Sequence, residues 1–266
     1  MPPLRLLVGQ GFARGSFFLL RYATSSRCNV SIPGIPSPVL PPGSLVVISG
    51  STGFIGSHIV DETFKAGYRV RGTTRNVDRN QGAVDYFRER YGEKSFELVE
   101  VKEMGNEDAF LEAAKDALGF IHVANDMGPK DDPQVSVDLA VQGALNALRA
   151  AATAGHKVFA YTSSSFAATQ PKPGVAFRFN EQTYNEEAVE KCSQAVAGSK
   201  EFGGDTIYSA SKVTVDQAIY AWAGDMPPTW SSTRDYPTSA RWVRTLCTSP
   251  PSSSDFTLLS SNPLQH

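Results

Sequence analysis

A glycine-rich loop between an apolar segment and a helical pattern is the feature that most restricts how this chain can fold. The apolar segment, 45–48, is short and uninterrupted, as expected of a parallel strand buried on both faces. The loop contains Gly50, Gly53 and Gly56, and a helical pattern follows it. Such a loop presents backbone N–H groups at the positive end of a helix dipole, where a phosphate group binds. The pattern predicts a pyrophosphate-binding unit, and the alternative is a glycine-rich turn without a ligand.

Strand-like and helical segments alternate through the middle of the chain. Repeated strand–helix units predict an α/β fold, a doubly wound parallel sheet with helices on both faces. We find no internal repeat in this part. The expected strands are 45–48, 68–74, 96–101, 120–124 and 157–162, and the expected helices include 109–118, 135–154 and 213–222.

Composition divides the 266 residues into three parts. No Asp, Glu or Lys occurs in 1–60, which is typical of an organellar transit peptide or of a disordered extension ending in a Pro-rich linker. The segment 226–266 is rich in Ser, Thr and Pro, and its aromatic residues follow no helical or strand spacing. We therefore expect an N-terminal extension in 1–40, a folded nucleotide-binding domain in 41–225 and an irregular tail in 226–266.

The overall charge and the cysteines exclude several functional classes. Lys and Arg number 25 against 27 Asp and Glu, so nothing in the charge favours nucleic acid or an anionic membrane as a partner. The apolar runs fall short of the ~18 residues that a membrane-spanning helix needs. The three cysteines form no C-x-x-C pair, so we expect neither a disulfide scaffold nor a metal site. We expect a cytoplasmic protein, or a mitochondrial one if 1–40 is a transit peptide.

Basic residues at the end of the second expected strand indicate which dinucleotide is bound. An NAD site usually has an acidic residue there for the ribose hydroxyls, whereas an NADP site has an arginine for the 2′-phosphate. Here Arg75 ends the strand and Arg79 lies one turn further on, while the nearest acid, Asp78, lies beyond the strand. Arginine pairs with phosphate through two charge-assisted hydrogen bonds. We therefore predict NADP(H), and we interpret Arg71 as a solvated charge at the strand surface.

A tyrosine and a lysine four residues apart provide candidate catalytic groups. Tyr208 and Lys212 would share one helix face. A free tyrosine has a pKa near 10, and a neighbouring ammonium stabilises the phenolate and lowers that pKa. The run 162–165 (Thr-Ser-Ser-Ser) ends the fifth expected strand, where ligands bind in such sheets. A hydroxyl from this run could hold the substrate oxygen beside Tyr208; the alternative is an ordinary strand-to-loop turn.

Together these motifs resemble one family. The glycine loop 50–56, the run 161–164 (Tyr-Thr-Ser-Ser) and the pair Tyr208 and Lys212 are similar to those of the extended short-chain dehydrogenases. More narrowly, 41–223 resembles the aldehyde and ketone reductases related to dihydroflavonol and cinnamoyl-CoA reductases, notably fungal ones. The resemblance implies a Rossmann fold, NADP(H) as cofactor and reduction of a small-molecule carbonyl to an alcohol.

The resemblance also implies a role for individual residues. The catalytic serine corresponds to Ser164, with Ser165 as the near alternative, and Tyr208 and Lys212 complete the catalytic set. Tyr208 and Lys212 are also expected to contact the cofactor. The other cofactor-binding positions that the resemblance implies are Gly50, Gly53, Phe54, Ile55, Gly56, Arg75, Arg79, Glu103, Val123 and Ala124.

Two departures from the family pattern keep alternatives open. Asn125 and Asp126 stand where relatives often have Ser or Thr followed by Pro. The family also continues after the Tyr–Lys helix with strands and helices that form the substrate lobe, whereas here 226–266 follows. We therefore expect an incomplete substrate lobe. The functions considered are an NADP-dependent carbonyl reductase, a catalytically impaired nucleotide-binding remnant, and a nucleotide-sugar epimerase or dehydratase, against which Arg75 argues.

Overall fold

The computed structural model describes most of the middle of the chain. The described residues are 38–126, 132–170, 172, 174–176, 178, 180, 182–195 and 203–225, together with the backbone of 231–235 and 243–247. The expected N-terminal extension, 1–40, lies outside the described residues except for its last three. The proposed boundaries between 1–40, 41–225 and 226–266 therefore stay a prediction.

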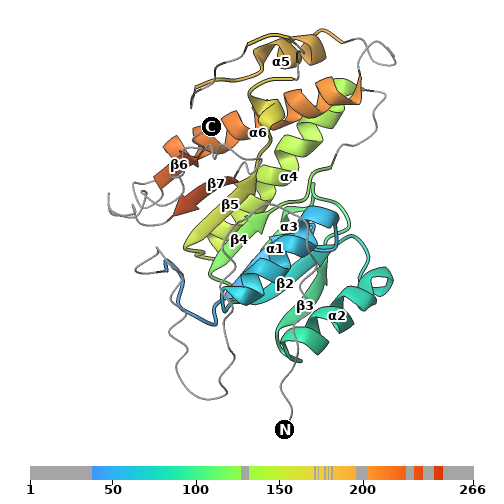
Figure 1. Ribbon diagram of the computed structural model, residues 1–266, viewed down its shortest axis with the longest axis vertical. Helices are drawn as coiled ribbons and strands as arrows, with labels where there is room; N and C mark the ends of the chain where they lie inside the picture. The colour runs from blue at the N-terminus through green and yellow to red at the C-terminus, as the bar shows by residue number, and fades with distance from the viewer. Residues whose placement is uncertain are drawn as a thin grey trace, which may run out of the picture.

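Five parallel strands form the centre of the fold, in the order β3-β2-β1-β4-β5 (Figure 1). Each begins and ends within two residues of the expected strand. The order reverses between β1 and β4, and ligands of open α/β sheets bind at such a point. This confirms the predicted doubly wound parallel sheet. The bounds are β1 Leu45–Ser49, β2 Arg69–Thr74, β3 Phe96–Glu100, β4 Gly119–His122 and β5 Val158–Thr162.

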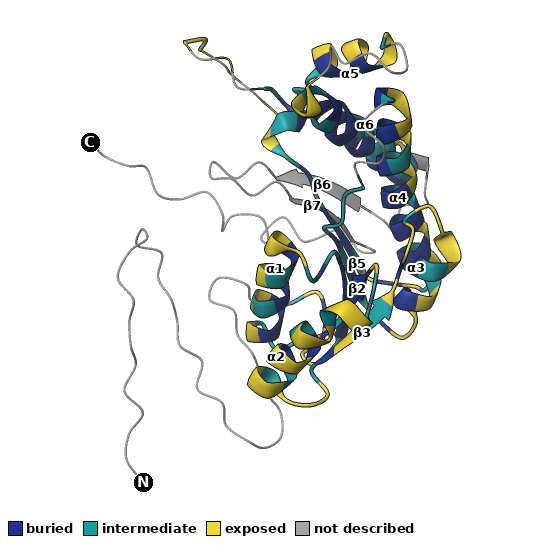
Figure 2. Ribbon diagram, turned by 90° about the vertical axis from the view of Figure 1, so that its right-hand side faces the viewer, coloured by how far each residue is buried: buried dark blue, intermediate teal, exposed yellow. Residues whose placement is uncertain are grey.

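Helices cover both faces of the sheet (Figure 2). On one face lie α1 and α2, and on the other lie α3, α4 and α6, with α5 packed against α4 and α6. The bounds are α1 Phe54–Lys65, α2 Gln81–Tyr91, α3 Glu107–Ala114, α4 Pro133–Thr153, α5 Glu186–Ser193 and α6 Gly204–Asp225, with short 3-10 turns η1 at Asp78–Asn80 and η2 at Ser165–Ala167. Among the described helices, none has the length and apolar character needed to cross a bilayer.

Successive side chains of β1 point alternately into two hydrophobic cores, one on each face of the sheet. Leu45 and Val47 pack with apolar side chains of α3, α4 and α6, whereas Val46 and Ile48 pack with those of α1 and α2. All five side chains of the strand are buried. Burial on both faces explains why this strand is a continuous apolar run rather than an alternating one.

Two helices differ from the sequence-based expectation in their bounds. The helix expected at 109–118 is α3, which ends at Ala114, and Asp116 then adopts a positive φ of 60° that no helix can continue. The helix expected at 213–222 begins earlier, so Tyr208 and Lys212 lie inside α6 rather than at its opening.

Two strands after α6 contradict the expectation of an irregular tail. β7, Val243–Cys247, pairs antiparallel with β5, and β6, Ser231–Asp235, pairs antiparallel with β7. Within the described residues the sheet therefore has seven strands and is not wholly parallel. The free edge of β5 presents a ladder of backbone donors and acceptors, so pairing there depends on the backbone more than on side-chain periodicity. The β-branched Val243 and Thr245 suit a strand.

Candidate active site

The glycine loop after β1 is folded tightly on itself. Gly50 has a φ of +67°, and a Cβ built there would lie 3.0 Å from the backbone nitrogen of Ala124. A Cβ at Gly56 would lie 2.0 Å from the carbonyl oxygen of Gly50, so only glycine fits. Gly53 donates its N–H to the Gly50 carbonyl at 3.0 Å and directly precedes α1. The loop thus has the cradle shape expected from its sequence.

The first turn of α1 adds backbone donors to this loop. The side chains of Phe54 and Ile55 are 83% and 56% exposed, so their role in the site rests on their backbone N–H groups. The turn holds no acidic residue, and the residue preceding α1 makes no side-chain cap. The positive end of the helix dipole is therefore uncompensated by side chains of this turn, which favours an anion.

The turn after β2 carries the two arginines predicted to select the cofactor. Arg75 and Arg79 are both exposed. Asn80 donates to Thr74 Oγ1 at 3.0 Å and to the Asn76 carbonyl at 2.8 Å, which fixes the turn between the arginines. The sequence-based reasoning missed this asparagine, although asparagine in a polar turn often bonds to the neighbouring backbone.

Arg71 is not the solvated charge that we expected. Its guanidinium pairs with the Glu97 carboxylate, with Nε and Oε1 2.6 Å apart, and its side chain is only 15% exposed. It also donates to the backbone carbonyls of Ala113 and Lys115. The reason is register, since β2 and β3 place Arg71 directly opposite Glu97. Arg71 therefore ties β2 to β3 and to the end of α3.

The other strand ends bring the remaining predicted residues to the same edge of the sheet. Parallel strands end at one edge, so the segments after β1, β2, β3, β4 and β5 all begin there. Glu103 follows β3 and is exposed, Val123 and Ala124 follow β4, and Ser164 follows β5. The structure thus gathers the predicted cofactor and catalytic positions at one edge of the sheet.

A buried serine and histidine that the sequence-based reasoning missed link β1 to β4 at this edge. Ser49 and His122 are the last paired residues of the two strands. The Ser49 oxygen accepts the N–H groups of Val123 and Ala124 at 3.0 and 3.1 Å. Burial, with a smaller contribution from the charge of Lys212, lowers the pKa of His122 to about 3. The histidine is therefore neutral at physiological pH.

The tyrosine–lysine pair lies on α6 as predicted, with the lysine fully enclosed. Lys212 is 3% exposed, and its Nζ donates to Tyr161 Oη at 3.0 Å and to the Thr162 carbonyl at 2.9 Å. The same Nζ lies 5.7 Å from the centre of the half-buried Tyr208 ring. Burial lowers the pKa of Lys212 to about 8, against an opposing effect of the Asp216 carboxylate.

The candidate catalytic serine lies in a turn that packs on the same helix. Ser164 Oγ accepts the N–H of Phe166 at 3.2 Å and so caps η2. The Phe166 ring contacts the Tyr208 ring edge-on, with 5.8 Å between centroids. Ser164 is half-buried whereas Ser165 is exposed, which favours Ser164 over its neighbour. The turn after β5 is thereby held against the Tyr208 side of α6.

A second charged residue of α6 was also missed. Asp216 is buried and accepts a hydrogen bond from Ser163 Oγ at 3.0 Å. It stands four residues after Lys212, and therefore on the same helix face. Spacing alone could have indicated this carboxylate, because the helix then carries a tyrosine, a lysine and an aspartate at intervals of four.

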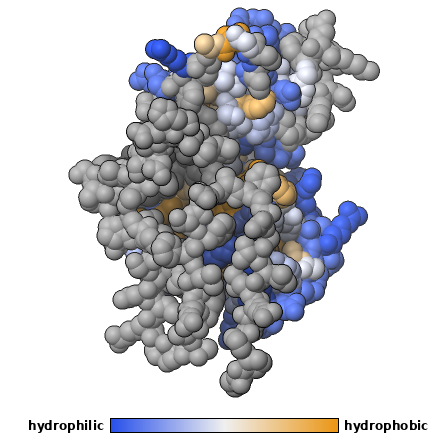
Figure 3. Space-filling model, viewed as in Figure 1, coloured by the Kyte–Doolittle hydropathy of each residue, from blue (hydrophilic) through white to orange (hydrophobic). Residues whose placement is uncertain are grey.

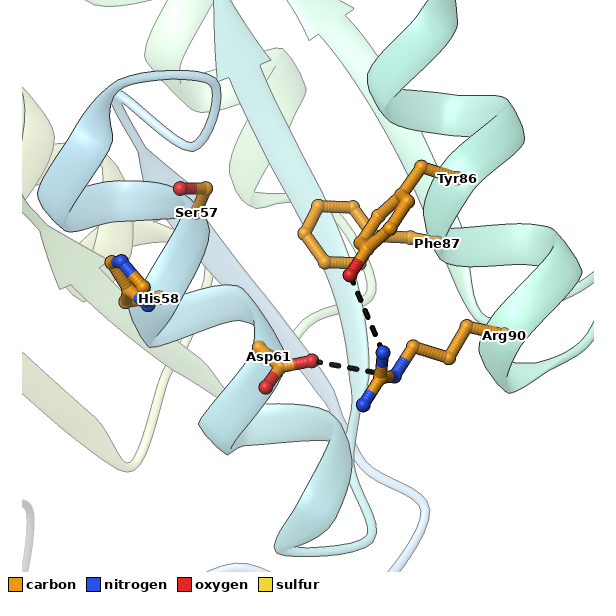
Figure 4. Close-up of a pocket in the computed structure, with 6 residues that line it drawn as sticks. All are labelled: Ser57, His58, Asp61, Tyr86, Phe87 and Arg90. Atoms are coloured by element: carbon orange, nitrogen blue, oxygen red, sulfur yellow. Dashed lines mark hydrogen bonds and ion pairs between the residues drawn. The ribbon is translucent and has the colours of Figure 1, made fainter. Parts of the chain in front are cut away.

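A shallow pocket between α1 and α2 is separate from these groups. In Figure 4, Arg90 reaches from α2 to Asp61 on α1, an ion pair of 3.9 Å, and Tyr86 Oη lies 3.4 Å from the same guanidinium. Hydrophilic residues dominate the surface in the region of α2 (Figure 3). None of the predicted cofactor or catalytic residues lines the pocket, whose remaining walls are Ser57, His58 and Phe87.

Comparison with known proteins finds an aldehyde reductase and a ketoreductase among the proteins to which this chain is similar. Aldehyde reductase 2 of Sporidiobolus salmonicolor is 34% identical over 196 residues, covering 73% of this chain and 57% of that protein. A ketoreductase of Penicillium rubens is 34% identical over 197 residues, which cover 71% of this chain and 55% of that protein. The crystal structure of yeast methylglyoxal/isovaleraldehyde reductase complexed with NADPH shares the fold, with a TM-score of 0.55 and 22% sequence identity. The match covers 68% of this chain and 53% of that one.

The chain thus spans just over half the length of these relatives. A family model described as the NAD dependent epimerase/dehydratase family matches residues 46–229. That match includes the glycine loop, the turn after β2, the Ser164 turn and the Tyr–Lys helix, which together form the edge described above. On its fold, its site and this match, the chain belongs to the NAD dependent epimerase/dehydratase family.

Proposed function

We propose that this protein is an NADP(H)-dependent oxidoreductase that reduces an aldehyde or ketone to an alcohol. The observation that carries the proposal is the enclosed Lys212 ammonium beside Tyr208, on the helix that packs against the Ser164 turn. The named activities of the fungal relatives, an aldehyde reductase and a ketoreductase, support the same reaction class.

The loop and turn at the sheet edge fit a dinucleotide phosphate. A Cβ at Gly50 or Gly56 would fill the cradle, so the bare backbone there suits a pyrophosphate. Arg75 and Arg79 would pair with the 2′-phosphate, and Val123 and Ala124 would line the ribose side, with Glu103 on the adenine side. When bound, the cofactor supplies the hydride that adds to the carbonyl carbon.

The candidate catalytic residues would orient the substrate carbonyl, donate the proton and stabilise the resulting charge. The oxygen of Ser164 accepts the Phe166 N–H, so its hydroxyl hydrogen is available to donate to a substrate carbonyl and orient it. Tyr208 gives its proton to the carbonyl oxygen as general acid. The charge of Lys212 stabilises the negative oxygen that this leaves on Tyr208. The neutral His122 adds no competing positive charge.

The proposal is tested on the full chain with NADPH and a panel of aldehydes and ketones. We expect substrate-dependent NADPH oxidation, and a loss of roughly 10²–10⁴-fold in kcat for Tyr208→Phe, which keeps the ring and removes the proton. Tyr86→Phe removes an exposed hydroxyl from α2 and serves as the matched control. Normal turnover by the Tyr208 variant, or no reduction of any carbonyl by the wild type, would contradict the proposal.

We further propose that the protein acts in the cytoplasm, with the mitochondrion as the alternative. The alternative depends on 1–40 acting as a transit peptide. A fluorescent fusion that keeps the N-terminus free, compared with one lacking 1–40, distinguishes the two compartments.

A further inference from the structure

Tyr161 on β5 is the side chain most closely engaged with the candidate catalytic lysine. Its ring is 2% exposed, its hydroxyl accepts from Lys212 Nζ at 3.0 Å, and the same nitrogen lies 4.8 Å from its ring centre. We propose that Tyr161 is a positioning residue that holds the Lys212 ammonium in place and keeps it charged, an inference that rests on the function proposed above.

The lysine needs such a holder because its own stem is flexible. A lysine ammonium is a compact charge on four methylene groups, with three N–H donors. Among the described residues, the hydrogen-bond acceptors of the Lys212 ammonium are the Thr162 carbonyl and the Tyr161 hydroxyl. Any residue at 162 would present the carbonyl, so the choice of side chain matters only at 161. The centre of the Tyr208 ring lies 5.7 Å from Lys212 Nζ.

The charges around Lys212 show why one more acceptor matters. Four ionisable groups face it: Tyr208 and Asp216 from α6, His122 from β4 and Tyr161 from β5. Burial lowers the pKa of Lys212 to about 8, and Asp216 opposes that effect. Because this pKa is close to physiological pH, removal of an oxygen acceptor would leave Lys212 neutral in a larger fraction of the molecules.

Two substitutions distinguish the contribution of the Tyr161 hydroxyl from that of its ring. Tyr161→Phe removes the oxygen but keeps the aromatic face beneath the ammonium, whereas Tyr161→Leu removes both. The first readout is the pKa of Lys212, followed by NMR on isotope-labelled lysine side chains and assigned with Lys212→Met. We expect the pKa to fall by about one pH unit in the Phe variant and further in the Leu variant.

The second readout is the pH profile of kcat, which a purely structural role would not move. The ammonium is the active form, so the alkaline limb should shift to lower pH in Tyr161→Phe by the same amount as the pKa. Tyr68→Phe is the matched control, because it removes a part-buried hydroxyl bonded to the Leu40 carbonyl, on the face of the sheet covered by α1 and α2. This control should leave both readouts at their wild-type values.

The outcomes separate the inference from the function on which it rests. An unchanged Lys212 pKa in a Tyr161 variant that retains a cooperative thermal transition overturns the inference, whether or not the protein reduces carbonyls. A lowered pKa with an unchanged pH profile also overturns it. A wild type that reduces no carbonyl contradicts the proposed function, while the NMR comparison still decides what Tyr161 does.

Discussion

The side-chain oxygen of Ser49 lies 2.9 Å from Nδ1 of His122, at the point where β1 and β4 diverge. The same oxygen accepts two backbone N–H groups, those of Val123 and Ala124. A hydroxyl has two acceptor lone pairs and one hydrogen, so that hydrogen must be donated to Nδ1. The His122 proton is therefore on Nε2, and one serine joins the ends of both strands.

Replacing Ser49 with Ala should loosen this edge. Two backbone N–H groups and a histidine nitrogen would lose their partner inside the protein, at an expected cost of about 1–3 kcal/mol in unfolding free energy. NADPH should also bind more weakly, since Val123 and Ala124 would move. Urea unfolding and NADPH titration measure the two effects. Ser209→Ala removes a buried hydroxyl that donates to the Asp205 carbonyl of the same helix, and it should leave NADPH affinity unchanged. Equal effects from both variants would contradict the role of Ser49.

Alanine at two glycines should have opposite effects on stability. At Gly56 the new Cβ would meet the Gly50 carbonyl oxygen at 2.0 Å, so the loop must move, and we expect a loss of more than about 2 kcal/mol. At Gly82, inside α2, nothing lies within 4 Å of the new atom, and alanine should stabilise the helix by about 0.5–1 kcal/mol. Chemical denaturation checks both. A stable, NADPH-binding Gly56 variant would contradict the steric account of the loop.

Removing the buried charge of Lys212 should stabilise the protein while abolishing its activity. The folded pKa of about 8 lies below the ordinary 10.5, so between these values the unfolded chain binds more protons. Stability of the wild type should therefore rise with pH across that window. Lys212→Met should remove the rise and, because it removes the cost of burying the charge, add about 1–3 kcal/mol near neutral pH. Denaturation at a series of pH values measures this; a less stable Met variant would show that the hydrogen bonds of the lysine outweigh its burial.

Arg75 should set the preference for NADPH over NADH. Loss of a charge-assisted contact with the 2′-phosphate is expected to weaken NADPH binding by about 1.5–3 kcal/mol, without changing NADH binding. Fluorescence titration of Arg75→Ala with both cofactors tests this. Arg149→Ala, which removes an exposed arginine from α4, is the matched control. Equal affinities of the wild type for the two cofactors would exclude a role for Arg75 in the choice.

Local sequence patterns predicted a structural feature correctly where the residues that determine it lie within one segment of the chain. The glycine loop could be predicted because Gly53 and Gly56 pack against Gly50 within one segment of seven residues, although the contact of Gly50 with Ala124 is not local. The pairing of Tyr208 with Lys212 on one helix face follows from helical periodicity alone. β1 was predicted because burial on both faces requires an apolar run. The segment 243–247 was missed since its pairing depends on the exposed edge of β5, which lies some 85 residues earlier in the chain.

The sequence by itself therefore determined the doubly wound core, the glycine loop and the identity of the candidate catalytic residues. Only the tertiary structure decided what surrounds them. Strand register placed Glu97 opposite Arg71 and His122 opposite Ser49, and the packing of α6 on β5 brought Lys212 to Tyr161. These contacts join residues 26 to 73 positions apart, so no local periodicity encodes them. They arise because a buried polar group must find its partner among whatever neighbours the folded sheet provides.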